Sequence, residues 1–408
     1  MGLYNFDEKI SRKNTNSLNV EGWRTYIFGA EGENKEFAFA DDEFIRMWIA
    51  DMEFAVAPEI REAIVDRVNQ KIFGYTLVYE KEYFDVFRKW CKDRYDWDIN
   101  PEEICFSAGI IPALYQLVED LVAEDEKVMT MTPAYGYFKH ASDYSGREMI
   151  KCPMKFENGH FSLDFDEFER KISDPKLKML FLCNPHNPSG HIWTKEELEF
   201  MASKIEEKGI WVVSDEIHCD LLRTGKAHTT MAKIMPGYDK LIVCMSASKT
   251  FNMAGLMFSN VFIRNEEERA RFKSRDKLLG SVSPLSIAAH KAAYEKGGAW
   301  LNELKLYIDG TLAELKAFFD KNLPKAVFEI PEATYFAWLD FRAYFDDTES
   351  LTDFFADKAG VLVEGGNSLF VGNADGFIRL NLAMPRETVM EALCRIKRAI
   401  DGRHTEGL

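Results

Sequence analysis

The chain has 408 residues, which is long for one ordinary core, so we expect two domains or one large domain with an appendage. Its composition, 46% hydrophobic and 29% charged, is typical of a soluble globular protein. The formal net charge of −16 repels phosphate backbones and anionic lipids, so neither nucleic acid nor a membrane is an expected partner. The 7 cysteines form no CxxC pair, and the N-terminus lacks a secretion signal; we therefore expect no metal site and a cytoplasmic location.

The first part of the chain, residues 1–50, is predicted to be an N-terminal segment that joins a smaller C-terminal domain. The sequence turns apolar at residues 47–52. Pro58 then begins a helix-like run over 59–71, which ends before Gly74 and Tyr75.

A helix is predicted to start after Gly109. Glycine permits close backbone approach, and Pro112 suits a first helical turn. The exposed amides of Ile110 and Ile111 could then bind a phosphate group at the positive end of the helix. The GxGxxG and GxxxxGK[ST] patterns are absent, which disfavours dinucleotide and nucleoside triphosphate sites.

The middle of the chain alternates short apolar runs with helix-periodic segments such as 195–207. The runs have the length of buried strands, at 127–131, 179–183, 211–213, 241–244 and 261–263. This alternation predicts a mostly parallel sheet covered on both faces. Ligands of such sheets bind beyond the carboxyl ends of the strands, so the residues that follow each strand are the candidate site.

Two strand ends carry polar residues of this kind. After 179–183, two prolines and a glycine fix a rigid loop at 184–190, from which Asn187 could donate a hydrogen bond; the alternative is a plain turn. After 211–213, Asp215 is expected to be buried and to need a cationic partner. A structural arginine, a helix N-terminus or a protonated pyridine nitrogen would each serve.

The strand at 241–244 is followed by Ser246 and then by Lys249. A lysine taken alone is usually a solvated surface group. Here small hydroxyl residues surround it directly after a buried strand. A desolvated lysine amine has a lowered pKa and acts as a nucleophile or forms a Schiff base.

From about residue 285 the pattern changes to long helices at 285–296 and 300–319, strands at 335–341 and 377–382, and a helix at 386–400. This predicts a smaller α+β domain. Arg379 lies inside its apolar strand and needs an anion, either a structural carboxylate or the carboxylate of a substrate.

Together, the stretches 48–52, 184–190, 215–218 and 246–252 resemble the fold-type I pyridoxal-phosphate aminotransferase superfamily, and within it the cystathionine β-lyase branch. The resemblance covers nearly the whole chain. It implies an α/β fold with a mostly parallel seven-stranded sheet between helices and a smaller α+β domain. The predicted boundaries are 1–50 for the N-terminal segment, 51–285 for the large cofactor-binding domain and 286–408 for the small domain.

The resemblance also implies roles for the residues around the cofactor ring. Lys249 would form the covalent aldimine with pyridoxal phosphate, and Asp215 would pair with the pyridine nitrogen. Asn187 would donate to the phenolic oxygen of the ring, and Tyr135 would stack on its face. His218 occupies a position where many aminotransferases have a tyrosine, which leaves its hydrogen bond open.

Further roles follow for the phosphate and the substrate. The amides of Ile110 and Ile111, together with Ser246, would bind the phosphate, and Tyr75 would reach the phosphate of a neighbouring subunit in a homodimer. The substrate would be a small amino acid. Arg379 is expected to bind its α-carboxylate, with Asp51 near this group. Pro133 and Pro188 lie where relatives have cis peptide bonds.

On this resemblance we favour β-elimination from cystathionine or another cysteine S-conjugate, which gives a thiol, pyruvate and ammonia. No residue spacing separates this reaction from transamination, so an aminotransferase of an amino acid is the first alternative. A third hypothesis, from a different class, is a regulatory protein that retains the cofactor.

Overall fold

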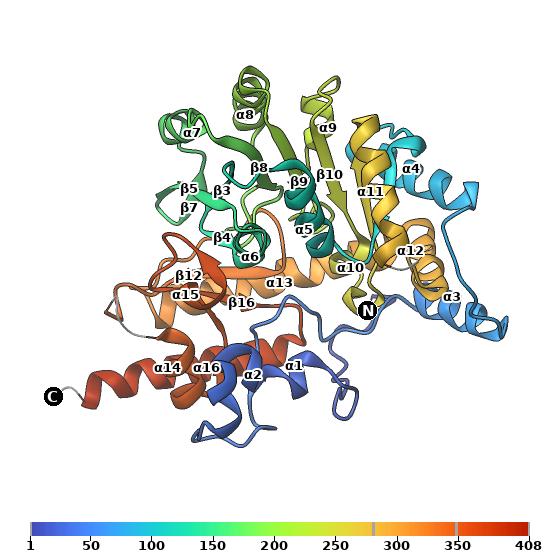
Figure 1. Cartoon of the computed structure of the whole chain (residues 1–408). Coiled ribbons are helices and arrows are strands. Elements are labelled where there is room, and N and C mark those ends of the chain that lie inside the picture. Colours follow the sequence, from blue (N-terminus) through green and yellow to red (C-terminus); the bar gives the residue numbers. More distant parts are fainter. Residues whose placement is uncertain (1, 280–281, 347–349, 407–408) are drawn as a thin grey trace.

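A seven-stranded sheet forms the centre of the larger part of the protein (Figure 1). The computed structural model describes residues 2–279, 282–346 and 350–406. The strand order in the sheet is β2-β11-β10-β9-β8-β3-β5. The strands span Ile104–Ser107 (β2), Lys127–Thr132 (β3), Glu148–Pro153 (β5), Leu177–Cys183 (β8), Trp211–Asp215 (β9), Leu241–Met245 (β10) and Ser259–Ile263 (β11).

The sheet is mostly parallel, as the sequence predicts. Strands β5, β3, β8, β9 and β10 pair in parallel, whereas β11 is antiparallel to both β10 and β2. All five residues of β9, β10 and β11 are buried, which explains why they appear in the sequence as continuous apolar runs.

Successive strand residues point to opposite faces, and each face has its own helices. Phe181 and Val213 belong to a core with helices α5 (Ile110–Leu121), α6 (Gly136–Tyr144) and α11 (Glu266–Leu279). Leu182 and Val212, one position along, pack instead with α7 (Phe165–Ile172) and α8 (Lys195–Lys208). Helix α8 starts with a capping box between Thr194 and Glu197 and ends at Gly209.

The second part of the protein is built on a small antiparallel sheet. Its order is β12 (Phe336–Asp340), β16 (Phe377–Asn381) and β14 (Glu364–Gly365). Helices α13 (Gly298–Asn322), α14 (Leu351–Ala359) and α16 (Arg386–Glu406) accompany it, with α1 (Leu18–Glu21) and α2 (Trp23–Phe28) of the N-terminal segment. Trp23 and Phe44 pack here on Leu362, which ties the N-terminal segment to this part.

The remaining elements are short or lie at the edges. Helix α12 (Pro284–Lys296) packs on α3 (Pro58–Asn69) and α4 (Lys81–Tyr95). The others are α9 (Met231–Ile234), α10 (Ala247–Thr250), α15 (Gly366–Leu369), β1 (Ile45–Arg46), β4 (Ala134–Tyr135), β6 (Lys155–Glu157), β7 (His160–Ser162), β13 (Val361–Leu362), β15 (Phe370–Val371) and the 3-10 turns η1 (Gly29–Asn34), η2 (Pro101–Glu103) and η3 (Ala254–Leu256).

Two further observations relate to the sequence predictions. The peptide bonds before Pro133 and Pro188 are cis, as expected, and the bond before Pro185 is also cis, which was not predicted. Within the described residues, none of the helices has the length and apolar character needed to cross a membrane.

Candidate active site

The polar residues that follow strands β8, β9 and β10 meet at one edge of the large sheet. In the parallel register Asp215 lies between Cys183 of β8 and Cys244 of β10. The backbone N–H of Asn184 donates to the Asp215 carbonyl at 2.8 Å, and that of Glu216 donates to the Cys244 carbonyl at 2.9 Å. The start of the loop 184–190, Asp215 and the start of α10 therefore lie next to one another.

Lys249 lies on α10, just beyond β10. Its Nζ donates a hydrogen bond of 2.7 Å to the backbone carbonyl of Ala50. Burial lowers the pKa of this amine; Arg379 acts in the same direction, while Asp51 and Asp215 oppose it. An amine with a lowered pKa is a better nucleophile near neutral pH.

Asp215 is a buried carboxylate, 6% exposed, at the end of β9. Burial raises its pKa to about 7, although Oδ1 accepts a hydrogen bond of 3.1 Å from the Ile217 N–H. Among the described residues it has no cationic side chain within ion-pair distance. A carboxylate in this position could accept a cationic group as its partner.

His218 and Asn187 lie in the same region. Burial lowers the pKa of His218 to about 3, helped by Lys249 and Arg379, so the ring is neutral. Its Nδ1 is buried and has no hydrogen-bond partner in the part of the chain that the structure describes. The Asn187 Oδ1 accepts from Nη1 of Arg379 at 3.3 Å, which brings a residue of β16 to the edge of the large sheet.

Arg379 is almost fully buried, at 1% exposed. Its Nη2 donates to the Trp48 carbonyl at 2.8 Å, and the guanidinium carbon lies 4.2 Å from the ring centre of Phe336. The Nε has no hydrogen-bond partner among the described residues. Burial lowers the pKa of Arg379, whereas Glu364 acts to raise it.

Glu364 was not predicted from the sequence. It pairs in register with Arg379 across β14 and β16, so the two side chains lie on the same face of the small sheet. Burial raises the pKa of Glu364 to about 7, and Ser368 Oγ is 3.4 Å from its Oε2. Tyr135 is a further neighbour, because Arg379 and Asp215 both influence its pKa, which burial raises.

The backbone of residues 48–52 forms hydrogen bonds with several of these groups. Two of its partners, Asn252 and Asn381, were not predicted as site residues from the sequence. Asn381 donates to the Ile49 carbonyl at 2.7 Å; Asn252 accepts from the Met52 N–H and donates to the Met52 carbonyl, both at 3.0 Å. A signal for Asn252 is its place in the motif 246–252. Asn381 lies two residues after Arg379, on the same side of β16.

The predicted phosphate-binding residues lie at the same sheet edge, on the side of β11 and β2. Helix α5 begins at Ile110, so the amides of Ile110 and Ile111 belong to its first turn and have no partner inside the helix. A Cβ added to Gly109 would meet only Pro112, at 3.4 Å. Ser246 caps α10 and donates to the Phe258 carbonyl at 2.7 Å, directly before β11.

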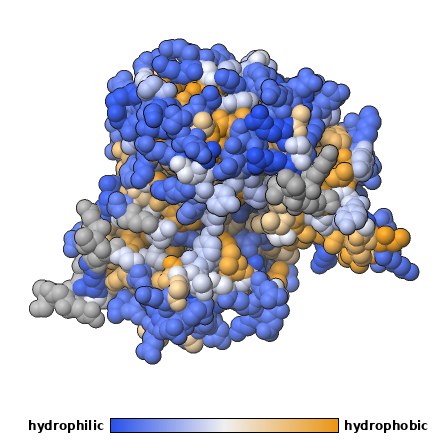
Figure 2. All heavy atoms as spheres, viewed as in Figure 1, coloured by the Kyte–Doolittle hydropathy of each residue, from blue (hydrophilic) through white to orange (hydrophobic). Residues whose placement is uncertain are grey.

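Tyr75 is not brought to this site within one chain. It is fully exposed, on the segment that connects α3 with α4. Other large apolar side chains are exposed around it: Val65, Val68, Ile72, Phe73, Leu77 and Tyr79. We call these residues and Tyr75 the apolar patch; Figure 2 shows hydrophobic surface on the right, where Figure 1 has α3 and this segment.

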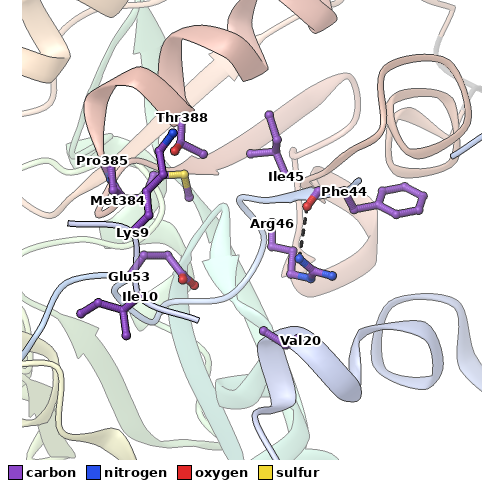
Figure 3. A pocket seen from close by; sticks show the side chains of 10 residues that line it. All are labelled: Lys9, Ile10, Val20, Phe44, Ile45, Arg46, Glu53, Met384, Pro385 and Thr388. Atoms are coloured by element: carbon purple, nitrogen blue, oxygen red, sulfur yellow. Dashed lines mark hydrogen bonds between the residues drawn. The ribbon is translucent and has the colours of Figure 1, made fainter. Parts of the chain in front are cut away.

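A separate cavity of about 190 Å³ lies in the second part of the protein (Figure 3). It is lined by the N-terminal segment, by residues 44–46 and by residues 384–388 at the start of α16, with Glu53 on one wall. None of the predicted site residues lines this cavity.

Comparisons with known proteins agree over nearly the whole chain. The model of the family of class I and II aminotransferases matches residues 43–396. Cystathionine β-lyase PatB of Bacillus subtilis is 36% identical over 399 residues, which is 97% of this chain and 100% of PatB. The PLP-bound C-S lyase from Staphylococcus hominis has a TM-score of 0.92 and 42% identity, covering 97% of this chain and 98% of that one. Cystalysin from Treponema denticola, whose crystal structure contains pyridoxal 5′-phosphate, has a TM-score of 0.90 and 34% identity, covering 98% and 99%.

Proposed function

The chain belongs to the family of class I and II aminotransferases, and we propose that it is a pyridoxal-phosphate-dependent carbon–sulfur β-lyase. Its substrates would be cystathionine or other cysteine S-conjugates. Loss of the Cα proton and cleavage of the Cβ–S bond release the thiol, and the remaining three-carbon enamine takes up one water to give pyruvate and ammonia. The observation that carries the lyase activity is the full-length similarity to proteins named cystathionine β-lyase and C-S lyase.

The residues of the site fit this cofactor. Asp215 is a buried carboxylate that forms no ion pair with a side chain of the described residues, and a protonated pyridine nitrogen would supply a cationic partner. The amides of Ile110 and Ile111 are available for a phosphate at the start of α5. Lys249 is an amine of lowered pKa at the same sheet edge.

We infer the following roles for these residues. When bound, pyridoxal phosphate supplies an electron sink that stabilises negative charge at the substrate Cα. Arg379 binds the substrate α-carboxylate, which orients the Cα–H bond. Lys249 Nζ takes the proton from Cα, since it is the amine released next to this carbon when the substrate binds. Asp215 holds a proton on the ring nitrogen.

Asn187, His218 and Tyr135 complete the proposed binding of the ring. Asn187 would donate to the phenolic oxygen through its amide nitrogen, because its Oδ1 accepts from Arg379. The buried Nδ1 of His218 has no partner in the described residues and could hydrogen-bond to the bound group. Tyr135 would stack on the ring.

We further propose that the protein is a homodimer that uses the apolar patch as part of its interface. The patch exposes seven large apolar side chains over a short stretch of chain, more than a monomer usually leaves in water. Tyr75 would extend from it to the phosphate in the partner subunit. Replacing Phe73 by aspartate should give monomers in analytical ultracentrifugation, and an unchanged dimer would refute this interface.

We propose a cytoplasmic location from the cysteines alone. All seven are free thiols, six of them buried and Cys394 exposed. Free thiols persist in a reducing compartment.

The decisive experiment is incubation of the purified holoenzyme with L-cystathionine in the absence of any keto acid. We expect equal amounts of homocysteine, pyruvate and ammonia, and no product from the Lys249→Ala variant. Absence of thiol and pyruvate with brisk amino transfer to an added keto acid would instead identify an aminotransferase. Absence of both activities, with the cofactor still bound, would favour the regulatory hypothesis.

A further inference from the structure

The N-terminal segment crosses between the two parts of the protein and is fixed there by side chains at several points (Figure 1). Phe6 is buried, with its ring centre 5.1 Å from that of Phe54 and 5.6 Å from that of Trp300. Tyr307 of α13 donates a hydrogen bond to Asp7. The residues that follow contact Glu387 of α16 through Lys9, and Asp51 and Glu53 through Arg12.

Arg12 is the charged contact of this segment with residues 51–53. Its Nη2 is 2.6 Å from Asp51 Oδ2, and its Nη1 is 3.3 Å from Glu53 Oε1. Glu53 is also fixed by Asn19, whose Nδ2 donates to the same oxygen at 2.7 Å. The Arg12 side chain is 26% exposed, and its partners are 21% and 25% exposed, so these contacts are partly shielded from water.

The adjacent Lys13 also forms an ion pair, but in a much more exposed position than Arg12. Lys13 lies 3.4 Å from Asp42, and both side chains are 62% exposed. Such a surface pair contributes little to stability. Lys13 therefore provides a matched control for Arg12, one residue away and of the same charge.

The backbone at Ala50 and Asp51 contacts residues of the candidate site. The carbonyl of the preceding residue, Ala50, accepts the hydrogen bond from Lys249 Nζ. The backbone carbonyl of Asp51 accepts from Asn381. The charge of Asp51 raises the pKa of Lys249, as does that of Asp215, whereas Arg379 lowers it. Asp51 also raises the pKa of Tyr335, and Lys249 and Arg379 lower the pKa of His218.

We propose that Arg12 is a positioning residue that pairs with the Asp51 carboxylate and so limits the action of this carboxylate on Lys249, which makes the N-terminal segment a functional part of the active site. The inference rests on the proposed function, because it requires a cofactor linked to Lys249. By neutralising part of the Asp51 charge, Arg12 sets how strongly this carboxylate stabilises a positive charge on the lysine nitrogen.

A purely structural tie is the competing explanation. Figure 3 shows Glu53 on the wall of the small cavity together with Lys9 and Ile10, so the same contacts also join the segment to the second part of the protein. A tie of this kind would change stability when broken, but it would not change the titration of a group at Lys249.

The test measures the visible absorbance of the holoenzyme against pH, without substrate, which reports protonation of the linkage between Lys249 and the cofactor. The variants are Arg12→Gln, Arg12→Lys, Asp51→Asn and the double variant Arg12→Gln/Asp51→Asn, with Lys13→Gln as the control. For Arg12→Gln we expect an upward shift of the midpoint by about 0.5–1 pH unit, because the Asp51 charge is no longer compensated. Its kcat/KM should fall about ten-fold.

The other variants test whether Arg12 acts on the midpoint through Asp51. Arg12→Lys keeps one charged contact and should restore most of the wild-type midpoint, and Lys13→Gln should leave it unchanged. In the Asp51→Asn background, removal of Arg12 should cause no further shift. A wild-type midpoint in Arg12→Gln, or an equal shift in both backgrounds, would overturn the proposal. Because the titration needs no substrate, it remains informative if cystathionine is not cleaved; that outcome would count against the lyase activity alone.

Discussion

Replacement of Asp215 by asparagine should stabilise the cofactor-free protein at neutral and alkaline pH while it weakens the holoenzyme. In the free protein the carboxylate is buried and forms no ion pair with the described residues, and burial raises its pKa from 3.8 to about 7 although Lys249 acts to lower it. Asparagine keeps the shape and the acceptor that binds the Ile217 N–H, but it removes the buried charge. On the proposed role, the charged carboxylate lowers the stability of the free protein and is neutralised by the bound cofactor.

The sign and size of the effect follow from proton linkage. A carboxyl group whose pKa is higher in the folded than in the unfolded state binds its proton more tightly when folded. Stability from this group is therefore greatest below about pH 4 and is lost as pH rises to about 7. The difference of about three pH units corresponds to about 4 kcal/mol, at about 1.4 kcal/mol per unit. Asp215→Asn should match the wild type near pH 4 and exceed it by up to about 4 kcal/mol above pH 7.

The assay is urea unfolding of both proteins between pH 4.5 and 8.5, after the cofactor has been removed with hydroxylamine and dialysis. Asp125→Asn is the control, because Asp125 is exposed in the turn before β3. With cofactor restored, the order should invert, since the wild-type carboxylate then pairs with the ring nitrogen. A difference between apo proteins that does not change with pH, or a variant less stable at pH 8, would refute the reasoning.

Three further changes test the site. Lys249→Ala should abolish turnover and the visible absorbance of the linked cofactor, with an unchanged circular dichroism spectrum; retained activity would contradict the assignment. Arg379→Gln should raise KM for cystathionine roughly 10- to 100-fold with a smaller change in kcat, because a charge-assisted hydrogen bond to the substrate carboxylate is lost; a change in kcat alone would argue against this contact. Glu364→Gln should raise the thermal midpoint at pH 8.5 but not at pH 5, because burial raises the pKa of Glu364 from 4.5 to about 7 and its charged form costs about 3 kcal/mol; equal midpoint changes at both pH values would contradict it.

The sequence predicts the parts of the site that depend on local pattern. Asp215 ends one buried strand and Lys249 lies shortly after the next, and parallel strands bring their carboxyl ends to one edge. The apolar runs in the sequence predict the strands β8 to β11, because these strands are buried on both faces. The edge strand β5 was not predicted, because it alternates between exposed and buried residues and includes Lys151.

The rest of the site depends on contacts that local pattern does not encode. Backbone carbonyls of residues 48–52 bind Arg379, Lys249 and Asn381, and any amino acid supplies such a carbonyl. Glu364 is one of many glutamates in the sequence, and only the register of β14 against β16 sets it beside Arg379. Arg12 lies in a polar segment without periodicity, so nothing in its neighbourhood distinguishes it from Lys13.

The carbonyl contacts of residues 48–52 also constrain the order in which the protein can mature. Trp48 and Arg379 are 331 positions apart, and Ala50 and Lys249 are 199 apart. Pairings of such separation close very large loops and form slowly. During synthesis residues 48–52 emerge long before β16, because Arg379 follows Trp48 by 331 positions. On the proposed role of Arg379, binding of the substrate carboxylate would thus be a late event in biogenesis: a nascent chain that has completed the large sheet already contains Lys249 and Asp215 but still lacks Arg379.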